Sequence, residues 1–450
     1  MRFISRLIRA AFGLLFIAAA FYFFLIPEAT VILRLTTDKG LRENRIPDTA
    51  FAIHHSLSPR YASYANTRVA SGAAARLDYR DIAATEWPLF GSCFYLWATE
   101  SLQDAWEADN SLSTTAPSTY AENAINAATT LVIDPGHAAW VKKHWGETDY
   151  LRRGNCFYRT LVISALTSHH NLTGSTRHLK LLRTQVVSLA NEIDRSPHGL
   201  IDDYPNQCYP TDVNAAVAAI LRADPLLGTD HSTFAERALR GFIDERASPL
   251  GLPPFFADSK TGKPIGGARG SSTAYFTILA PTIWPERGDA WYNLFEQGFW
   301  QSNFFSSGFR EYPHGVGSDF FFDIDAGPVI SGYSPAASAF GLAAARTNNR
   351  YDHAFPLAAE LLASSWPLPN GPLLTPLIAS AIGARTHAPY LGECAVLFQL
   401  TRTSPASTTG GVGTGRIPVV VVVLLTIYFL LAIAMLAKGV KLLRKPPADP

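Results

Sequence analysis

An uninterrupted apolar run lies at each end of the chain, and these two runs most constrain how the chain can fold. Ala10–Pro27 is an 18-residue stretch without a charge, and Ile417–Ala437 is a 21-residue stretch without one. A helix rises about 1.5 Å per residue and a bilayer core is about 30 Å thick, so about 20 apolar residues suffice to cross it. We therefore expect a membrane-spanning helix at each end. A cleaved signal peptide is the alternative for the first run, but apolar residues continue after the small cluster Ala18–Ala20.

The flanking cations predict the orientation of these helices, because Lys and Arg collect on the cytoplasmic side of a membrane. The cations before the first run and after the second are Arg2, Arg6, Arg9, Lys438, Lys441, Arg444 and Lys445. Both termini are therefore expected in the cytoplasm of a bacterial cell, with the main domain periplasmic and anchored in the inner membrane. The expected divisions are an anchor at 1–27, a connecting segment at 28–80, a folded domain at 81–400, a flexible linker at 401–416, a membrane helix at 417–437 and a basic tail at 438–450.

Composition narrows the function of the region between the two runs. Residues 28–416 carry 31 basic and 36 acidic residues, a balance of −5, so nucleic-acid binding is not expected. The four cysteines are open to three disulfide connectivities, between which the sequence does not choose. Cys and His spacings typical of a metal site are absent from the sequence, and no nucleotide or dinucleotide motif occurs in it, so neither a metal nor a cofactor is expected.

Apolar periodicity between about residues 80 and 395 is helical, which predicts an all-α domain. Breaks at Gly, Pro and Asn divide the region into about twelve segments, or six helical pairs. Gly174 is expected to end one helix, Thr211 and Asp212 are candidate N-caps of another, and Gly327-Pro328 is expected to open a third.

Three stretches carry a resemblance to a known family. They are YLRRGNCFYRTLVISALTSHHNLTGSTRHLKLLRTQVVSLANEID (150–194), GLIDDYPNQCYPTDVNAAVAAI (199–220) and FFFDIDAGPVISGYSPAASAFGLAAAR (320–346). Together they resemble the six-hairpin toroid enzymes, with the closest resemblance to linalool dehydratase-isomerase domain proteins and a remoter one to glucuronyl C5-epimerases and (α/α)6 glycosidases. The resemblance implies an (α/α)6 six-hairpin toroid flanked by the two membrane helices. Asp212 stands where linalool dehydratase-isomerase has a second cysteine, so Cys208 is the single thiol of this motif.

In such a ring, loops at one end of the inner helices surround a funnel, and polar groups collected there form the default site. The richest loop is 201–212, where Asp212 and Tyr204 are candidate catalytic residues. The candidate substrate-binding residues of this loop are Asp202, Asp203, Asn206, Cys208 and Tyr209. The alternatives are an ordinary N-cap for Asp212, packing for the tyrosines, and a disulfide or inert thiol for Cys208.

A second polar loop, 309–325, supplies Glu311 and Asp323 as candidate catalytic carboxyls and His314 and Asp325 as candidate binding groups. Three Phe residues precede Asp323, and apolar neighbours raise the pKa of a carboxyl toward the range that acid–base catalysis needs. The alternative for Asp325 is that it caps a following helix.

A third cluster, at the expected mouth of another inner helix, contains Asp149 and Arg153 as candidate substrate-binding residues. Its alternative is an ordinary pair of surface charges.

These features predict a membrane-anchored, extracytoplasmic enzyme acting on an envelope glycan or a lipid-linked substrate. Glycoside hydrolase, lyase and epimerase chemistry, by carboxylate and tyrosine acid–base catalysis, all remain open. Two alternatives are a hydro-lyase or isomerase of a hydrophobic alcohol, which requires an apolar funnel around Cys208, and a non-catalytic glycan-binding scaffold, whose acids would face solvent.

Overall fold

The computed structural model describes residues 2–243, 250–382, 387–405 and 415–444. Helices make up 67% of the chain, and the strands are few and short, which confirms the predominantly helical fold predicted from the sequence. Most of the expected linker, 406–414, and the end of the expected basic tail, 445–450, lie outside the described residues.

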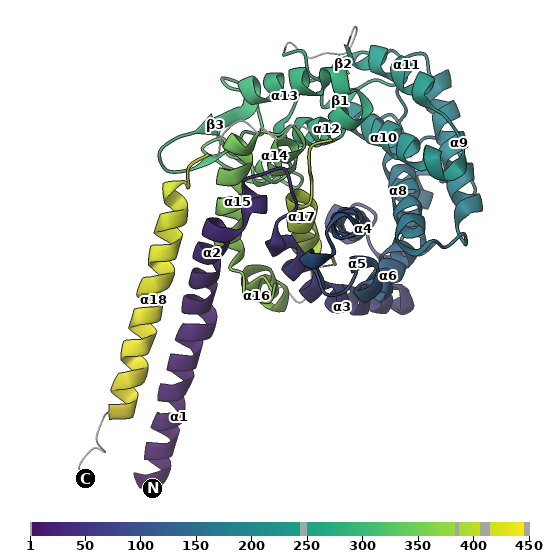
Figure 1. Cartoon of the computed structure of the whole chain (residues 1–450). Coiled ribbons are helices and arrows are strands. Elements are labelled where there is room, and N and C mark those ends of the chain that lie inside the picture. Colours follow the sequence, from purple (N-terminus) through teal and green to yellow (C-terminus); the bar gives the residue numbers. More distant parts are fainter. Residues whose placement is uncertain (1, 244–249, 383–386, 406–414, 445–450) are drawn as a thin grey trace.

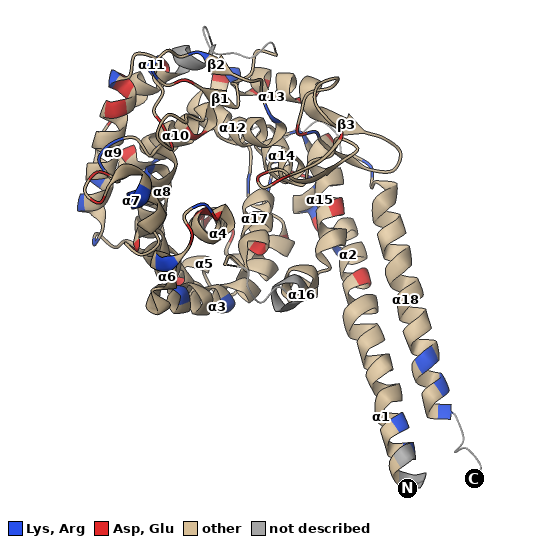
Figure 2. Cartoon of the chain, turned by 180° about the vertical axis from the view of Figure 1, so that it is seen from behind, with Lys and Arg blue, Asp and Glu red and all other residues tan. Residues whose placement is uncertain are grey.

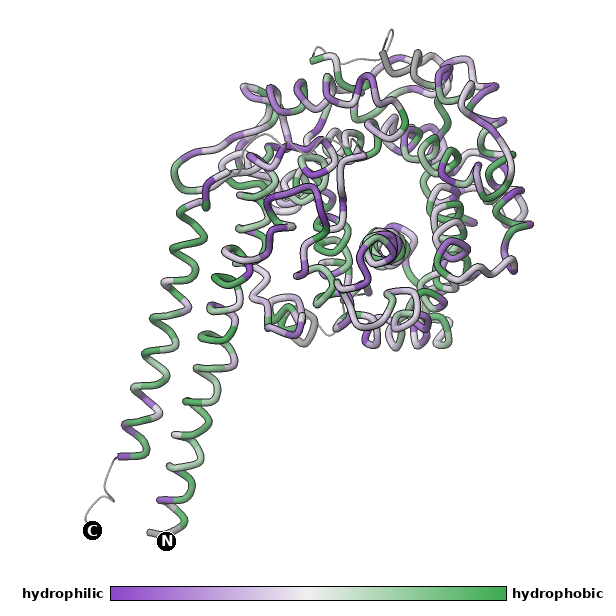
Figure 3. The backbone as a smooth tube through the Cα atoms, viewed as in Figure 1, coloured by the Kyte–Doolittle hydropathy of each residue, from purple (hydrophilic) through white to green (hydrophobic). Residues whose placement is uncertain are grey.

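Two helices at the ends of the chain project together from the folded domain (Figure 1). They are α1 (Arg2–Ala20), which continues through a π-helical turn (Phe21–Leu25) into α2 (Ile26–Thr37), and α18 (Val419–Arg444). The spans Arg6–Thr37 and Val419–Arg444 are long and apolar enough to cross a membrane. Figure 3 shows hydrophobic residues along most of both helices, and Figure 2 shows Lys and Arg near the free end of each.

The two terminal helices pack side by side because glycines let their backbones approach closely. A Cβ atom added at Gly13 would lie 2.9 Å from the carbonyl oxygen of Gly439, and one at Gly439 would lie 2.8 Å from that of Gly13. Nearer the domain, the ring of Tyr428 on α18 stacks on Trp366 at 4.8 Å. These contacts tie the helical pair to itself and to the domain.

In the described part of the chain, six helices of the main domain contact one another in a closed cycle that follows chain order (Figure 1). They are α4 (Ile82–Ala108), α8 (Cys156–Thr173), α10 (Pro210–Leu227), α12 (Gly270–Ile283), α14 (Pro335–Thr347) and α17 (Leu391–Leu400), which returns to α4. Small residues on these helices are fully buried, as in the Ala343–Ala345 run of α14, and they allow close packing.

A second set of helices lies outside this cycle (Figure 1). They are α3 (Asp48–Ser71), α6 (Glu122–Ile133), α9 (Leu179–Arg195), α11 (Ser232–Ile243), α13 (Pro285–Phe299) and α15 (Tyr351–Ser365). The segment 28–80, which the sequence suggested as a connection, thus contributes α3, a 24-residue helix that packs on α6 and α17. Short helices complete the fold: α5 (Pro117–Tyr120), α7 (Ala139–Trp145), α16 (Leu374–Ile382) and the 3₁₀ turns Lys39–Leu41, Ala73–Arg76 and Asn110–Leu112.

In the part of the chain that the structure describes, three short antiparallel hairpins lie on loops between the helices. They are β1 (Phe256–Ala257) with β2 (Pro264–Ile265), β3 (Trp300–Ser302) with β4 (Ser307–Phe309), and β5 (Phe320–Asp323) with β6 (Gly327–Ile330). The prediction that Gly327-Pro328 opens a helix is therefore wrong. The chain first forms β6, and α14 begins at Pro335, where the hydroxyl of Ser334 accepts a hydrogen bond from the N–H of Ala337.

Of two other helix ends predicted from the sequence, one is confirmed and one is wrong. Gly174 follows α8 with a φ of 67°, a left-handed conformation that glycine adopts without a Cβ clash. The prediction of Thr211 or Asp212 as an N-cap is wrong, because α10 begins earlier: Tyr209 is the N-cap, without a side-chain cap, and Pro210 is the first helical residue. Asp212 therefore lies inside the first turn with its carboxyl free of a capping role.

Candidate functional site

A cavity of about 730 Å³ opens at one end of the cycle of six helices. Each of these helices, or the loop before it, contributes to its wall. The lining residues are Tyr79, Arg80, Ile82, Glu86, Trp87, Phe90, Phe94, His144, Phe157, Asp203, Tyr204, Gln207, Tyr209, Thr211, Asp212, Phe255, Ser271, Ser272, Tyr275, Ile324, Asp325, Ala336, Ala339, Phe340, Leu391, Ala395 and Gln399. Five of the thirteen residues that the sequence proposed for the site are among them: Asp203, Tyr204, Tyr209, Asp212 and Asp325.

Aromatic side chains form the wall below the polar groups. Phe90 lies 4.2 Å from Phe94, 6.0 Å from Tyr275 and 6.3 Å from Phe340, measured between ring centroids. Tyr275 and Phe340 are themselves 5.5 Å apart, so rings from α4, α12 and α14 meet across the cavity. Such a wall excludes water from a bound molecule and strengthens electrostatic interactions within the site.

Glu86 is the carboxyl that sequence reasoning missed. It lies on α4, one helical turn before Phe90 and two before Phe94, on the face that lines the cavity. The hydroxyl of Tyr204 donates a hydrogen bond to it. Burial, together with the negative charges of Asp325 and Asp212, raises the pKa of Glu86 to about 8. The i, i+4, i+8 spacing of an acid with two Phe residues on one apolar helix is the signal that could have identified it.

Two further carboxyls act on Glu86 electrostatically. Burial first, and then the charge of Asp325, raises the pKa of Asp212 to about 7. Burial and the charge of Asp323 raise the pKa of Asp325, while Arg269 acts in the opposite direction. Because Glu86, Asp212 and Asp325 come from α4, α10 and the β5–β6 turn, the fold brings together acids that are far apart in sequence.

Asp203 also lines the cavity, but its carboxylate binds backbone N–H groups of the loop in which it lies and of α8. Its Oδ1 accepts a hydrogen bond from the N–H of Phe157 at 2.8 Å and its Oδ2 one from the N–H of Tyr209 at 3.0 Å. Burial and the charge of Asp212 raise the pKa of Asp203, and the two N–H donors oppose them. Both oxygens are thus occupied, and Asp203 holds the loop 201–209 against the start of α8.

Positive charge is scarce at this cavity. Among the described residues that line it, Arg80 and His144 are the groups able to carry one. Arg80 is exposed, and burial lowers the pKa of His144, whose ring meets Tyr204 edge-on at 5.0 Å. The carboxyls that face the cavity are therefore not neutralised by a buried cation within it.

Glu311 and Asp323, proposed from the sequence as catalytic, instead surround Arg269. Glu311 is fully buried and accepts hydrogen bonds from Arg269 Nε and the Ser271 hydroxyl, both at 2.8 Å, and from the Ser334 hydroxyl at 2.9 Å. Asp323 Oδ2 lies 3.1 Å from Arg269 Nη2. Burial opposes ionisation of Asp323, but the N–H of Asp325 and the charge of Arg269 outweigh it and lower the pKa of Asp323. Neither residue lines the cavity.

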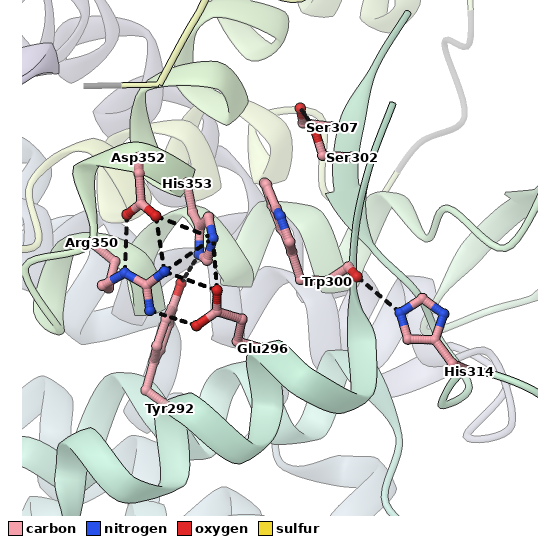
Figure 4. Close-up of polar contacts among 9 residues, drawn as sticks. All are labelled: Tyr292, Glu296, Trp300, Ser302, Ser307, His314, Arg350, Asp352 and His353. Atoms are coloured by element: carbon pink, nitrogen blue, oxygen red, sulfur yellow. Dashed lines mark hydrogen bonds and ion pairs between the residues drawn. The ribbon is translucent and has the colours of Figure 1, made fainter. Parts of the chain in front are cut away.

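The remaining proposed residues also lie outside the cavity lining. Asp149 and Arg153 form a partly exposed ion pair with a 3.2 Å separation, as their alternative interpretation held. Asp202 accepts a hydrogen bond from the N–H of Asn206, which is exposed. His314 Nε2 lies 2.9 Å from the carbonyl oxygen of Trp300, on the outer side of the β3–β4 hairpin (Figure 4).

The thiols offer no reactive group to the cavity. Cys93, Cys156 and Cys394 are free thiols, so none of the three disulfide connectivities is formed, and all four cysteines are buried. Cys208 is absent from the lining and has no exposed surface. Within the described residues, no group of three His, Cys, Asp or Glu side chains is arranged to hold a metal ion.

Comparison with known proteins yields no identification: no protein-family model and no curated protein matches this chain. The function of the protein is therefore inferred from the geometry of the cavity.

Proposed function

We propose that this protein is an acid–base enzyme that hydrolyses glycosidic bonds in a neutral envelope glycan, with its reaction centre at Glu86, Asp212 and Asp325. One observation carries the proposal. Three carboxyls from distant segments converge on one aromatic-walled cavity, where Glu86 and Asp212 are half-buried and Asp325 is exposed at the turn, and desolvation raises the pKa of all three. Carboxyl pairs with divergent pKa values are how glycosidases obtain an acid and a base from the same chemical group.

The pKa values indicate which carboxyl acts as the acid and which as the base. Glu86, with a pKa of about 8, is protonated at neutral pH and is the general acid that protonates the departing glycosidic oxygen. Asp212, with a pKa of about 7, is ionised in a large fraction of molecules and acts as the base toward water or as the nucleophile. Tyr204 holds the carboxyl of Glu86 in place through its hydroxyl.

The charge of the cavity selects among the carbohydrate reactions that the sequence left open. Lyases and C5-epimerases of uronic acids must bind a substrate carboxylate, which requires a cationic partner. Among the described residues that line the cavity, the one arginine, Arg80, is exposed, and the carboxylates of the cavity repel an anion. These features favour a neutral sugar, whose apolar ring face stacks on aromatic side chains such as Trp87 and Phe255.

We also propose that the closed cycle of inner helices with its outer helices is an (α/α)6 six-hairpin toroid, as the resemblance to linalool dehydratase-isomerase domain proteins implies. The order of contacts around the cycle supports this classification. The cations at the outer ends of α1 and α18 support an inner-membrane location with cytoplasmic termini and a periplasmic domain.

A hydro-lyase or isomerase of a hydrophobic alcohol is the second candidate, and the aromatic wall of Phe90, Phe94, Tyr275 and Phe340 favours it. A protonated Glu86 would serve equally well to protonate a departing hydroxyl group. Burial of Cys208 away from the cavity counts against a reaction that depends on this thiol. A non-catalytic scaffold, whose acids would face solvent, fits Asp325, which is exposed, but fits Glu86 and Asp212 less well, because these two are half-buried in the cavity wall.

The deciding experiment incubates the full chain in lipid nanodiscs with a panel of neutral oligosaccharides and, separately, with a terpene alcohol, followed by mass spectrometry of the products. We expect glycan hydrolysis that Glu86→Gln reduces by about 10²–10⁴-fold, the usual contribution of a general acid. Glu107→Gln is the matched control, because Glu107 is an exposed residue at the other end of α4. Conversion of the alcohol alone would favour the second candidate. Glycan hydrolysis undiminished in Glu86→Gln would contradict the assignment of the acid.

A further inference from the structure

One face of the β5–β6 hairpin is apolar and uncovered. Phe320 pairs with Ile330 and Phe322 with Pro328 across the two strands, so these four side chains lie on the same face. Phe320 is 66% exposed, Phe322 73% and Ile330 59%, and Pro328 is also exposed. A contiguous apolar surface of this kind on a folded domain marks a place where another apolar surface binds.

The opposite face of the hairpin is fixed to the domain, so the apolar face is held outward. Asp323 is bonded to Arg269, Val329 is buried, and the ring of Phe321 lies 5.3 Å from that of Tyr312. Arg310 forms an ion pair with Asp319 at the open end of the hairpin. Because Asp319 and Asp323 are each paired with an arginine, the strand between them presents little uncompensated charge, and Asp325 at the turn faces the cavity.

At its turn, this hairpin reaches the proposed reaction centre. Ile324 and Asp325 form part of the turn and line the cavity, and Ile324 is 44% exposed. The apolar face therefore continues into the cavity.

At its open end, the β5–β6 hairpin is bonded to the β3–β4 hairpin. Gln301 Nε2 donates to the carbonyl oxygen of Ser331 at 3.1 Å, and Asn303 Nδ2 donates to the hydroxyl of Tyr333 at 3.1 Å. The tip of β3–β4 carries the exposed residues Phe304 and Phe305.

The β3–β4 hairpin in turn meets the start of a terminal helix. The carbonyl oxygen of Phe305 accepts a hydrogen bond from the N–H of Val420 on α18 at 2.8 Å, and Figure 1 shows β3 beside the domain end of α18.

The base of the β3–β4 hairpin is rigidly held, so the tip keeps its position beside α18. Trp300 of β3 stacks on His353 at 4.1 Å, and His353 belongs to a network with Glu296, Arg350 and Tyr292 (Figure 4). The hydroxyls of Ser302 and Ser307 lie 2.9 Å apart across the two strands. The hairpin is thus fixed to α13 and α15.

We propose that these two hairpins form a lipid-docking surface, which binds the hydrocarbon chain of a bilayer lipid that carries the substrate sugar. The surface connects α18, one of the two helices able to span a membrane, with the cavity, so a lipid leaving the bilayer beside α18 can keep its chain covered while its head group enters. That the head group is a glycan rests on the proposed function; the binding of the chain does not.

A quenching experiment tests the surface independently of turnover. A small thiol-reactive fluorophore is attached at Phe322→Cys or Phe304→Cys in the full chain, reconstituted in phosphatidylcholine nanodiscs containing phosphatidylcholine spin-labelled on its acyl chain. The four native thiols are buried, which favours labelling at the introduced site. Val187→Cys is the matched control, because Val187 is an exposed apolar residue on α9, on the far side of the domain from α18 (Figure 1). We expect quenching at least twofold stronger at positions 304 and 322 than at 187.

Quenching at position 322 equal to that at 187 would overturn the proposal. The proposal would also be overturned if a second copy of the chain covers the label at position 322, which mass measurement would detect as a dimer. A second arm compares methyl and dodecyl glycosides of a sugar hydrolysed in the oligosaccharide panel. The double variant Phe320→Ser/Phe322→Ser is expected to lower kcat/KM at least tenfold for the dodecyl glycoside alone, and equal loss for both would also count against the surface. Strong quenching without any glycan hydrolysis would refute the proposed function while leaving the lipid surface standing.

Discussion

Two groups of acidic residues meet at the β5–β6 turn, which contributes Asp325 to one group and Asp323 to the other. Their environments make the two groups chemically different. Asp325 faces the cavity with Glu86 and Asp212, where desolvation raises the pKa of each, and Arg269 opposes the rise at Asp325 without reversing it. Asp323, two residues earlier, joins Glu311 around Arg269: the pKa of Asp323 is lowered, and at Glu311 the charge of Arg269 and the hydroxyls of Ser271 and Ser334 oppose the burial that raises its pKa. The difference teaches that a partner, more than residue type or position in sequence, decides whether a carboxyl is poised for proton transfer or serves to hold the fold.

The largest expected effect comes from removing Arg269, the cation that pairs with Glu311 and Asp323. Arg269→Met leaves Glu311 buried without its partner and should lower the free energy of unfolding by about 3–5 kcal/mol. Chemical denaturation monitored by circular dichroism measures the change. Arg237→Met, which removes the exposed pair with Asp194, is the control and should leave the free energy of unfolding nearly unchanged. Similar losses in the two variants would mean that the Arg269 group is not a buried structural pair.

A smaller effect on the free energy of unfolding, of opposite sign, is expected at Glu86 in the cavity. The pKa of Glu86 is raised to about 8 from an ordinary 4.5, so the folded state binds this proton more tightly than the unfolded state. Its contribution to stability is present at low pH and is lost as pH rises from about 4.5 through about 8. Glu86→Gln removes that loss and should raise the free energy of unfolding at pH 8.5 by about 1–3 kcal/mol, with little change at pH 4. Thermal denaturation at both pH values checks this, and a variant less stable at pH 8.5 would show that Glu86 is a structural carboxyl.

The same pKa values predict the pH dependence of turnover. The proposed base Asp212 must lose its proton near pH 7 and the proposed acid Glu86 must keep its proton until about pH 8, so kcat/KM should follow a narrow bell with its maximum between them. In Asp212→Asn the acidic limb should disappear along with most of the activity. A profile that stays flat from pH 5 to pH 9 would argue against both roles and erase the contrast with the Arg269 group.

The smallest effect is expected at the pair that the sequence proposed for substrate binding and that the structure places on the surface. Asp149→Asn breaks its partly exposed contact with Arg153 and should change the free energy of unfolding by less than about 0.5 kcal/mol. The kcat/KM for any glycan hydrolysed by the protein should stay within about twofold of wild type. A tenfold loss would extend the binding site beyond the cavity lining.

The sequence by itself determined the helical character of the chain, because apolar periodicity and glycine stops such as Gly174 are local properties. It also determined the two long apolar terminal helices, since length and the absence of charge suffice for that prediction. It placed the polar loop 201–212 at a site, and Asp203, Tyr204, Tyr209 and Asp212 do line the cavity.

Only the tertiary structure decided which acids act together. Glu86 looks in sequence like one polar residue in an apolar helix, and its distance from Asp212 and Asp325 depends on how two helices and a turn close around the cavity. Glu311 and Asp323 look suited to catalysis until Arg269, more than 40 residues earlier, is seen to neutralise them. Desolvation and charge pairing depend on what surrounds a group in space, and neither is a local property of the chain.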